Sequence, residues 1–174
     1  MTEMVILVDE NDNEIGFEEK QKAHIDGKLH RALSIFIFNS RNELLIQKRA
    51  NHKYHSGGKW ANTTCSHPRK GETLDKAVHR RLQDEMGFTT KLEKVFDFIY
   101  KARVGDLIEH ELDHVFIGYY EKEVNPNPEE VEDYKWMALD DIVLDIDKNP
   151  RKYGEWFEIM MKEHLDKIKS SLKQ

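Results

Sequence analysis

Two apolar runs that lie close together in the chain constrain its fold more than any other feature. Residues 31–38 (RALSIFIF) and 44–48 (LLIQK) flank the polar segment Asn39-Ser40-Arg41-Asn42. Apolar runs on either side of an Asn-containing turn predict a β-hairpin. The chain is therefore expected to build part of its core on a sheet.

The rest of the chain alternates strands with helices. Apolar residues recur at helical spacing over 74–86, which predicts a helix with Thr73 as its N-cap and Gly87 as its stop. Asn149-Pro150 predicts the start of a C-terminal amphipathic helix over about residues 150–170. Strands are also expected at 4–8, 60–65, 92–100, 107–120 and 134–137, a short helix at 139–146, and a loop over 50–59. This mixture indicates one α/β (α+β) domain over residues 1–174.

Length and composition restrict the class of protein. A chain of 174 residues suits one domain with a sizeable core. The lone Cys65 excludes an internal disulfide framework, and residues 1–20 lack the pattern of a signal peptide. No stretch approaches the ~20 apolar residues that a membrane span needs. We therefore expect a soluble, cytoplasmic protein.

The net charge of −6 conceals an uneven distribution. Residues 20–81 hold fourteen Lys and Arg, four Asp and Glu, and six of the nine His. Residues 88–174 hold thirteen basic and twenty acidic residues. The basic stretch is either an ordinary solvated surface or a site for an anion. A nucleic acid is the weaker candidate, because no nucleic-acid-binding motif accompanies the charge.

Cys65 and His67 lie at the end of the predicted strand 60–65, in the run Cys65-Ser66-His67-Pro68. The alternation of a strand can place both side chains on one face. A single Cys is most often a small buried apolar residue. The nearby His and the polar neighbours also suit a reactive thiol.

Two further patterns suit a metal. Glu109 and Glu111 share a face in a strand, and like charges that close repel each other unless a cation lies between them. Two solvated carboxylates on an exposed edge are the alternative. His24 and His30 flank Gly27, where the chain could turn back and bring both imidazoles to one metal ion. Alternatively, the two histidines have only a structural role.

The segment that ends at Gly87-Phe88 resembles the Nudix motif. That motif reads Gly, five residues, Glu, seven residues, Arg-Glu, an apolar residue, any residue, Glu-Glu, any residue, Gly and an apolar residue. The chain departs from it at Ser66 and at Arg81, where the motif has Gly and Glu. Arg81 and Glu85 are also helical neighbours, as in an ordinary exposed ion pair. The positions that match are Glu72, Arg80, Leu82, Asp84 and Glu85.

The departures are similar to those of one Nudix branch, the type I isopentenyl-diphosphate isomerases. Because the missing Glu takes part in metal binding in hydrolytic Nudix enzymes, its loss argues against hydrolysis. The resemblance covers about residues 4–165. Its features occur in order at Lys20, His24, Leu29-His30, Lys48-Arg49-Ala50, Lys53, Trp60-Ala61-Asn62-Thr63-Thr64-Cys65-Ser66-His67-Pro68, Arg80-Arg81, Glu85, Tyr100-Lys101, Glu109, Glu111 and Trp156. The segment Tyr54–Lys59 departs from many relatives, which have Pro-Gly near Gly57-Gly58.

The resemblance implies a Nudix-like mixed β-sheet between helices, and an enzyme that interconverts isopentenyl diphosphate and dimethylallyl diphosphate. Cys65 would exchange protons with one face of the isoprene unit, and Glu111 with Tyr100 would serve the other face. Trp156 would cover the carbocation with its ring. These are the predicted catalytic residues.

The resemblance also implies two metal sites and a diphosphate cradle. Zn²⁺, Mn²⁺ or Mg²⁺ would bind to His24, His30, His67, Glu109 and Glu111. A second ion, Mg²⁺, would bridge Glu85 and the diphosphate. The oxygens of the diphosphate would be held by Lys20, Arg49, Lys53 and Arg81.

Two other functions stay open at this point. A Nudix hydrolase of a nucleoside diphosphate derivative would not need Cys65, and a His-rich metal-binding protein would take up metal without turnover. The expected partner is a small isoprenyl diphosphate, with no nucleic acid and no membrane. The chain is expected to be a monomer or a weak homodimer.

Overall fold

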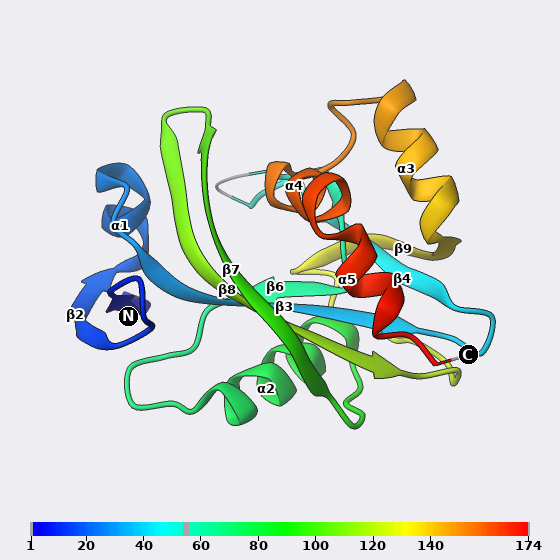
Figure 1. Ribbon diagram of the computed structural model, residues 1–174, viewed down its shortest axis with the longest axis horizontal. Coiled ribbons are helices and arrows are strands. Elements are labelled where there is room, and N and C mark those ends of the chain that lie inside the picture. The colour runs from blue at the N-terminus through cyan, green and yellow to red at the C-terminus, as the bar shows by residue number, and fades with distance from the viewer. Residues whose placement is uncertain (1, 54–55, 174) are drawn as a thin grey trace.

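The computed structural model describes residues 2–53 and 56–173 (Figure 1). Within these ranges the chain forms nine strands and five helices. The strands are β1 (Met4–Val8), β2 (Glu14–Glu19), β3 (His30–Phe38), β4 (Glu43–Arg49), β5 (Trp60–Ala61), β6 (Thr64–Ser66), β7 (Glu93–Val104), β8 (Leu107–Tyr119) and β9 (Val131–Ala138). The helices are α1 (Lys20–Asp26), α2 (Leu74–Met86), α3 (Leu139–Lys148), α4 (Glu155–Glu163) and α5 (Leu165–Ser170).

The sheet is mixed and is organised around β3. This strand runs parallel to β8, with pairs from His30↔Glu111 to Phe38↔Tyr119. It also pairs with β1, β4 and β6 in the antiparallel sense. On the far sides, β7 pairs with β8 and β9 pairs with β4. The predicted mixed sheet is confirmed.

Both faces of the sheet are covered, which explains why β3 is apolar almost throughout. Figure 1 shows α2 on one side of the sheet and α4 and α5 on the other. Phe36 and Phe38 pack with α3, α4 and α5, whereas Ile35 and Ile37 pack with α2. Successive residues of a strand point to opposite faces, so a strand buried on both faces needs apolar residues at nearly every position.

Two local predictions are confirmed in detail. In the β3–β4 hairpin, the Asn39 side-chain oxygen accepts hydrogen bonds from the backbone N–H groups of Arg41 and Glu43, each at 3.0 Å. At the start of α2, the Thr73 hydroxyl accepts a hydrogen bond from the Lys76 N–H at 3.3 Å. The helix ends at Gly87, which has a left-handed φ of 79°.

The predicted strand 60–65 and helix 150–170 are each interrupted. The strand consists of the short β5 and β6, which are separated by Asn62 and Thr63. The segment at 150–153 is not helical, because it pairs with β5: the Trp60 N–H donates to Lys152, and the Gly154 N–H donates to Trp60, both at 2.9 Å. Asn149 instead ends α3. The helix then runs as α4 and α5, divided at His164.

The predicted loop over 50–59 has no helix or strand in its described part, and Tyr54 and His55 lie outside the described residues. Lys59 anchors the end of this loop to α4 through an ion pair with Glu155 at 2.9 Å. Among the helices of the described ranges, none is long and apolar enough to cross a membrane.

Candidate active site

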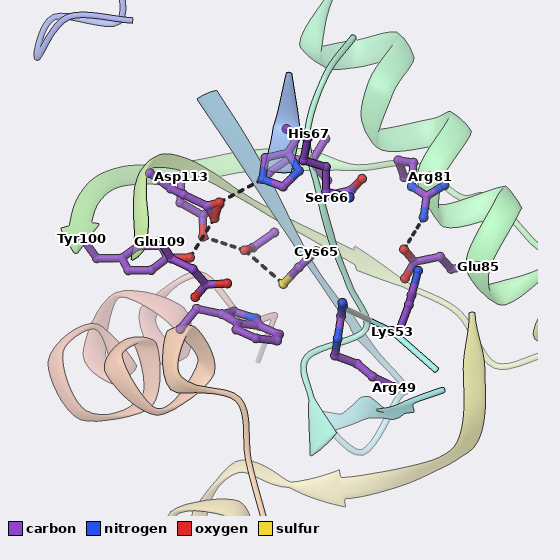
Figure 2. A pocket seen from close by; sticks show the side chains of 15 residues that line it. Arg49, Lys53, Cys65, Ser66, His67, Arg81, Glu85, Tyr100, Glu109 and Asp113 are labelled. Carbon is purple, nitrogen blue, oxygen red and sulfur yellow. Dashed lines mark hydrogen bonds and ion pairs between the residues drawn. The ribbon is translucent and has the colours of Figure 1, made fainter. Parts of the chain in front are cut away.

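One cavity between the sheet and α4 collects most of the residues that the sequence singled out. All eight predicted catalytic and diphosphate-binding residues line it, as do His67, Glu85 and Glu109. In Figure 2, Tyr100, Glu109 and Asp113 lie on one side, Arg49, Lys53 and Arg81 on the other, and Cys65 between them. The cavity therefore has an acidic end and a basic end.

The acidic end is built on one face of β8. Glu109, Glu111 and Asp113 occupy alternate positions of this strand, and all three are buried. Tyr100 lies directly opposite Glu111 on β7. The alternative of two solvated carboxylates on an exposed edge is therefore wrong.

Three imidazoles surround the Glu111 carboxylate. Potential ligand atoms of His24, His30, His67 and Glu111 all lie within 4.8 Å of one another, and all four residues are buried. The Nε2 atoms of His30 and His67 lie 3.2 and 2.9 Å from Glu111 Oε2. The fifth predicted ligand, Glu109, lies outside this group of four and faces the cavity.

The hydrogen bonding of His30 prepares it for a cation. Its Nδ1 lies 2.9 Å from the backbone oxygen of Lys28, which can only accept, so Nδ1 carries the hydrogen. In the neutral ring, Nε2 then presents a lone pair to the Glu111 carboxylate. A lone pair and a carboxylate oxygen repel each other unless a proton or a metal ion lies between them. This arrangement fits a divalent metal.

The electrostatics of the cluster also suit metal ligation. Burial, followed by the charge of His67, lowers the pKa of His24 to about 3, and burial lowers the pKa of His67. Burial would raise the pKa of Glu111, but His67 and His30 hold it well below its usual value. His30 differs: burial would lower its pKa, but its contact with Glu111 raises it. The lowered pKa values of His24 and His67 favour the neutral imidazoles that a metal requires, and the lowered pKa of Glu111 favours the charged carboxylate.

Tyr100 and Glu109 remain protonated more readily than usual. The Tyr100 hydroxyl donates to Glu111 Oε1 at 2.7 Å, and burial together with nearby carboxylates raises its pKa. Burial, followed by the charge of Glu111, raises the pKa of Glu109 well above its usual value. Glu111 therefore holds its charge next to a neutral phenol that donates a hydrogen bond to it.

Cys65 is held as a thiol on the cavity wall. Its Sγ lies 3.0 Å from Asn62 Oδ1 and 3.5 Å from Ser34 Oγ. Ser34 donates its hydroxyl hydrogen to Asp113 at 2.6 Å, so it offers only a lone pair to the sulfur. Burial, followed by the charge of Asp113, raises the pKa of the thiol. The surroundings therefore favour the protonated form.

Trp156 forms a further wall of the cavity. It lies on α4, and the Arg49 guanidinium is 5.5 Å from the centre of its ring. A Cβ atom at Gly154 would lie 2.7 Å from that ring, so only glycine lets the indole approach the backbone here. Gly154 thus contributes to the site through its missing side chain, which sequence patterns did not indicate.

The basic end consists of four cations, Lys20, Arg49, Lys53 and Arg81. Lys20 pairs with Glu3 at 3.3 Å, and Lys53 contacts Glu130. Arg81 pairs with Glu85 at 2.5 Å and lies 3.7 Å from Glu130. The Arg81–Glu85 pair is largely buried, so its interpretation as an ordinary exposed ion pair is wrong. Gln47 donates to the other Glu85 oxygen at 2.8 Å, which orients this carboxylate.

The comparisons with known proteins show the family to which the chain belongs. The NUDIX domain family matches residues 28–157. The chain is 52% identical over 159 residues to isopentenyl-diphosphate Delta-isomerase 1 of Aromatoleum aromaticum, covering 91% of this chain and 90% of that one. It is 48% identical to the isopentenyl-diphosphate Delta-isomerase of Serratia proteamaculans over 94% of this chain and 92% of that one. The chain belongs to the isopentenyl-diphosphate Delta-isomerase family.

The solved structures agree on the fold of this isomerase family member. DR0079 from Deinococcus radiodurans has a TM-score of 0.77 at 16% identity, over 93% of this chain and 99% of that one. A MutT protein from Methanosarcina mazei has a TM-score of 0.66 at 18% identity, over 83% of this chain and 96% of that one. At these identities the likeness concerns the Nudix fold alone.

Three residues in or beside this isomerase-family site had no sequence-based role. Ser34 and Asp113 line the cavity, and Asn62 lies behind Cys65. The signal for Asp113 was present, because it continues the alternation of Glu109 and Glu111. Ser34 stands out as a hydroxyl within the apolar run 31–38. Asn62 could be placed only once the break between β5 and β6 was known.

Proposed function

We propose that this protein interconverts isopentenyl diphosphate and dimethylallyl diphosphate. One observation carries the proposal: Cys65 and the Tyr100–Glu111 pair line the same buried cavity, which has a basic opposite end. A hydrolase of a diphosphate has no need for a thiol and a carboxylate at an apolar tail. An isomerase that moves a proton along an isoprene unit needs both.

The basic end would bind the diphosphate. Lys20, Lys53 and Arg81 line the cavity, and a diphosphate would take over part of their pairing with Glu3 and Glu130. Arginine can hold two phosphate oxygens at once. The isoprene unit would then extend toward Cys65, Tyr100 and Trp156.

The reaction adds a proton to the terminal alkene carbon and removes another from the carbon two bonds away. The double bond moves by one position, and the intermediate between the two steps is a tertiary carbocation. We assign the two proton transfers to Cys65 and to Glu111 with Tyr100, without an order. General acid–base catalysis of this kind contributes about 10²–10⁴-fold.

The walls of the cavity would protect the carbocation. Water would trap this cation as an alcohol, so the site has to exclude it. The buried Trp156 ring offers a π face to a cation, which is worth up to about 2 kcal/mol when both are desolvated. Arg49 above the same ring keeps that side chain in place.

His24, His30, His67 and Glu111 would hold a divalent metal, with Glu109 beside them. When bound, the metal supplies positive charge that sets the proton affinity of Glu111. Imidazole nitrogens together with a carboxylate suit Zn²⁺, Mn²⁺ or Mg²⁺. Glu85, oriented by Gln47 and Arg81, would serve a Mg²⁺ ion that accompanies the diphosphate.

The test is to incubate the metal-loaded protein with isopentenyl diphosphate and Mg²⁺ in D₂O and follow the products by NMR. Deuterium-containing dimethylallyl diphosphate is expected. Intact, unlabelled substrate would refute the isomerase function. Turnover of a nucleoside diphosphate derivative instead, with release of phosphate or nucleotide, would support the hydrolase alternative.

A further inference from the structure

The search for further functional residues leads to Asn62, which lies behind the cavity wall between β5 and β6. Its side chain is completely buried, with 0% exposure. It forms hydrogen bonds with four partners from β3, β6 and α4. A polar side chain placed this deeply is costly unless every hydrogen-bonding group is used.

The orientation of the Asn62 amide is determined from both of its ends. Its Nδ2 donates to the backbone oxygens of Ile35 at 3.1 Å and Thr64 at 3.0 Å, which uses both amide hydrogens. Its Oδ1 accepts from Trp156 Nε1 at 3.3 Å, and an indole nitrogen can only donate. A flipped amide would place oxygen against two carbonyls and NH₂ against an N–H, so only one orientation is compatible with these partners.

The same oxygen accepts a hydrogen bond from the Cys65 thiol, with Sγ 3.0 Å away. The other neighbour of the sulfur, Ser34, has already given its hydrogen to Asp113. Asn62 is therefore the acceptor toward which the S–H points. This bond holds the sulfur beside Asn62, while the hydrogen can still rotate about the Cβ–Sγ bond toward a substrate.

We propose that Asn62 is a positioning residue that ties the Cys65 thiol and the Trp156 indole to one oxygen. The inference rests on the proposed function for its catalytic consequence. Cys65 and Trp156 lie on β6 and α4, far apart in the sequence, and both face the isoprene end of the cavity. One rigid amide thus fixes the distance between the proton-transferring sulfur and the ring that covers the carbocation.

The test compares Asn62→Leu with Thr63→Val. Leu has a similar size but forms none of the four hydrogen bonds. Thr63 is equally buried, but its hydroxyl bonds only to the backbone of Ile37 and Leu45, so Thr63→Val controls for lost stability. We expect Asn62→Leu to lower kcat about 10²-fold with little change in KM, as misplacement of a reacting group by about 1 Å does. Thr63→Val should lower the melting temperature and leave kcat near that of the wild type.

Two measurements, one spectroscopic and one chemical, do not depend on turnover. The chain has three Trp, so its ¹⁵N spectrum shows three indole signals, and Asn62→Leu should shift that of Trp156. The alkylation rate of Cys65, which is the only Cys, should also change. Thr63→Val should change neither. Wild-type kcat, or unchanged signals in Asn62→Leu, would overturn the proposal.

Asn62→Ala is the second variant, because the space it opens can admit a water that satisfies the two backbone oxygens. If neither variant folds, Trp156→Phe removes one of the two bonds to Oδ1 and should alter the alkylation rate of Cys65. An unchanged rate would contradict the positioning role. Absence of isomerisation by the wild-type protein would instead refute the proposed function, and the spectroscopic readouts would still decide the role of Asn62.

Discussion

One face of β8 is polar in the first half of the strand and apolar in the second. Glu109, Glu111 and Asp113 are 3%, 6% and 2% exposed, and Val115 and Ile117, which continue the same face, are 0% and 5% exposed. The two halves are therefore equally buried. From Glu111 onward both halves also lie between the same strands, β3 and β7. Burial alone does not distinguish the active site from the core.

The two halves of β8 differ in the side chains that contact them. Val115 and Ile117 pack in the cluster formed with α3, α4 and α5, where apolar contact is sufficient. Each carboxylate of the first half needs a specific partner or a cation, because a buried charge without one is costly. Glu111 is close to Tyr100, His30 and His67, and Asp113 is bonded to Ser34. The polar half is thus expected to carry function, and the apolar half stability.

The largest expected effect comes from the polar half. Glu111→Gln should lower isomerase turnover about 10²–10⁴-fold, because it removes a proton-transferring group. It should also lower the metal content, because it removes the ionised ligand of the histidine cluster. Turnover is measured by NMR and metal by elemental analysis of dialysed protein. Normal metal content with normal turnover would contradict both assigned roles.

Cys65→Ala tests whether proton transfer and metal binding in the cavity are separable. The variant should lose turnover of isopentenyl diphosphate, since one face of the isoprene unit then has no proton-transferring group. The metal content should stay near that of the wild type, because the sulfur is not among the four clustered residues. Turnover is again measured by NMR and metal content by elemental analysis. Turnover comparable to that of the wild type would remove Cys65 from the mechanism.

Ile117→Ala tests the apolar half. Removing this side chain from the core should lower the free energy of unfolding by about 2–5 kcal/mol, measured by denaturant titration. The kcat of the protein that remains folded should change little, because Ile117 does not line the cavity. A large loss of kcat would show that the two halves are not separable.

The histidine cluster of the polar half also predicts a pH dependence of the stability of the metal-free protein. Folding lowers the pKa of His24 from 6.5 to about 3, mainly through burial. Between these values the unfolded chain binds a proton that the folded chain does not, so stability is greatest above pH 6.5 and falls toward pH 3. His24→Gln should make the decline of the melting temperature with acid less steep in EDTA-treated protein. An equal slope in both proteins would contradict the assigned pKa.

Much of the fold was predictable because its signals are local. The turn at Asn39–Asn42, the Thr73 cap and the Gly87 stop each depend on residues a few positions apart, and all three are confirmed. The predicted helix 150–170 failed in its first turn, because the backbone around Lys152 pairs with Trp60. That partner lies about ninety residues away in the sequence, where helical periodicity contains no information about it.

The sequence by itself determined which residue types carry the chemistry, through the order and spacing of Cys65, His67, Glu109, Glu111 and the basic residues of 20–81. The family resemblance implied that His24, His30, His67 and Glu111 share a site. The tertiary structure brings them together from α1, β3, the segment after β6, and β8, and leaves Glu109 outside this group of four. It also placed Asp113 and Ser34 in the cavity and showed that the oxygen end of the Asn62 amide faces Cys65. Local patterns set which face a side chain occupies, whereas the register of β3 against β8 and the packing of α4 set which faces come into contact.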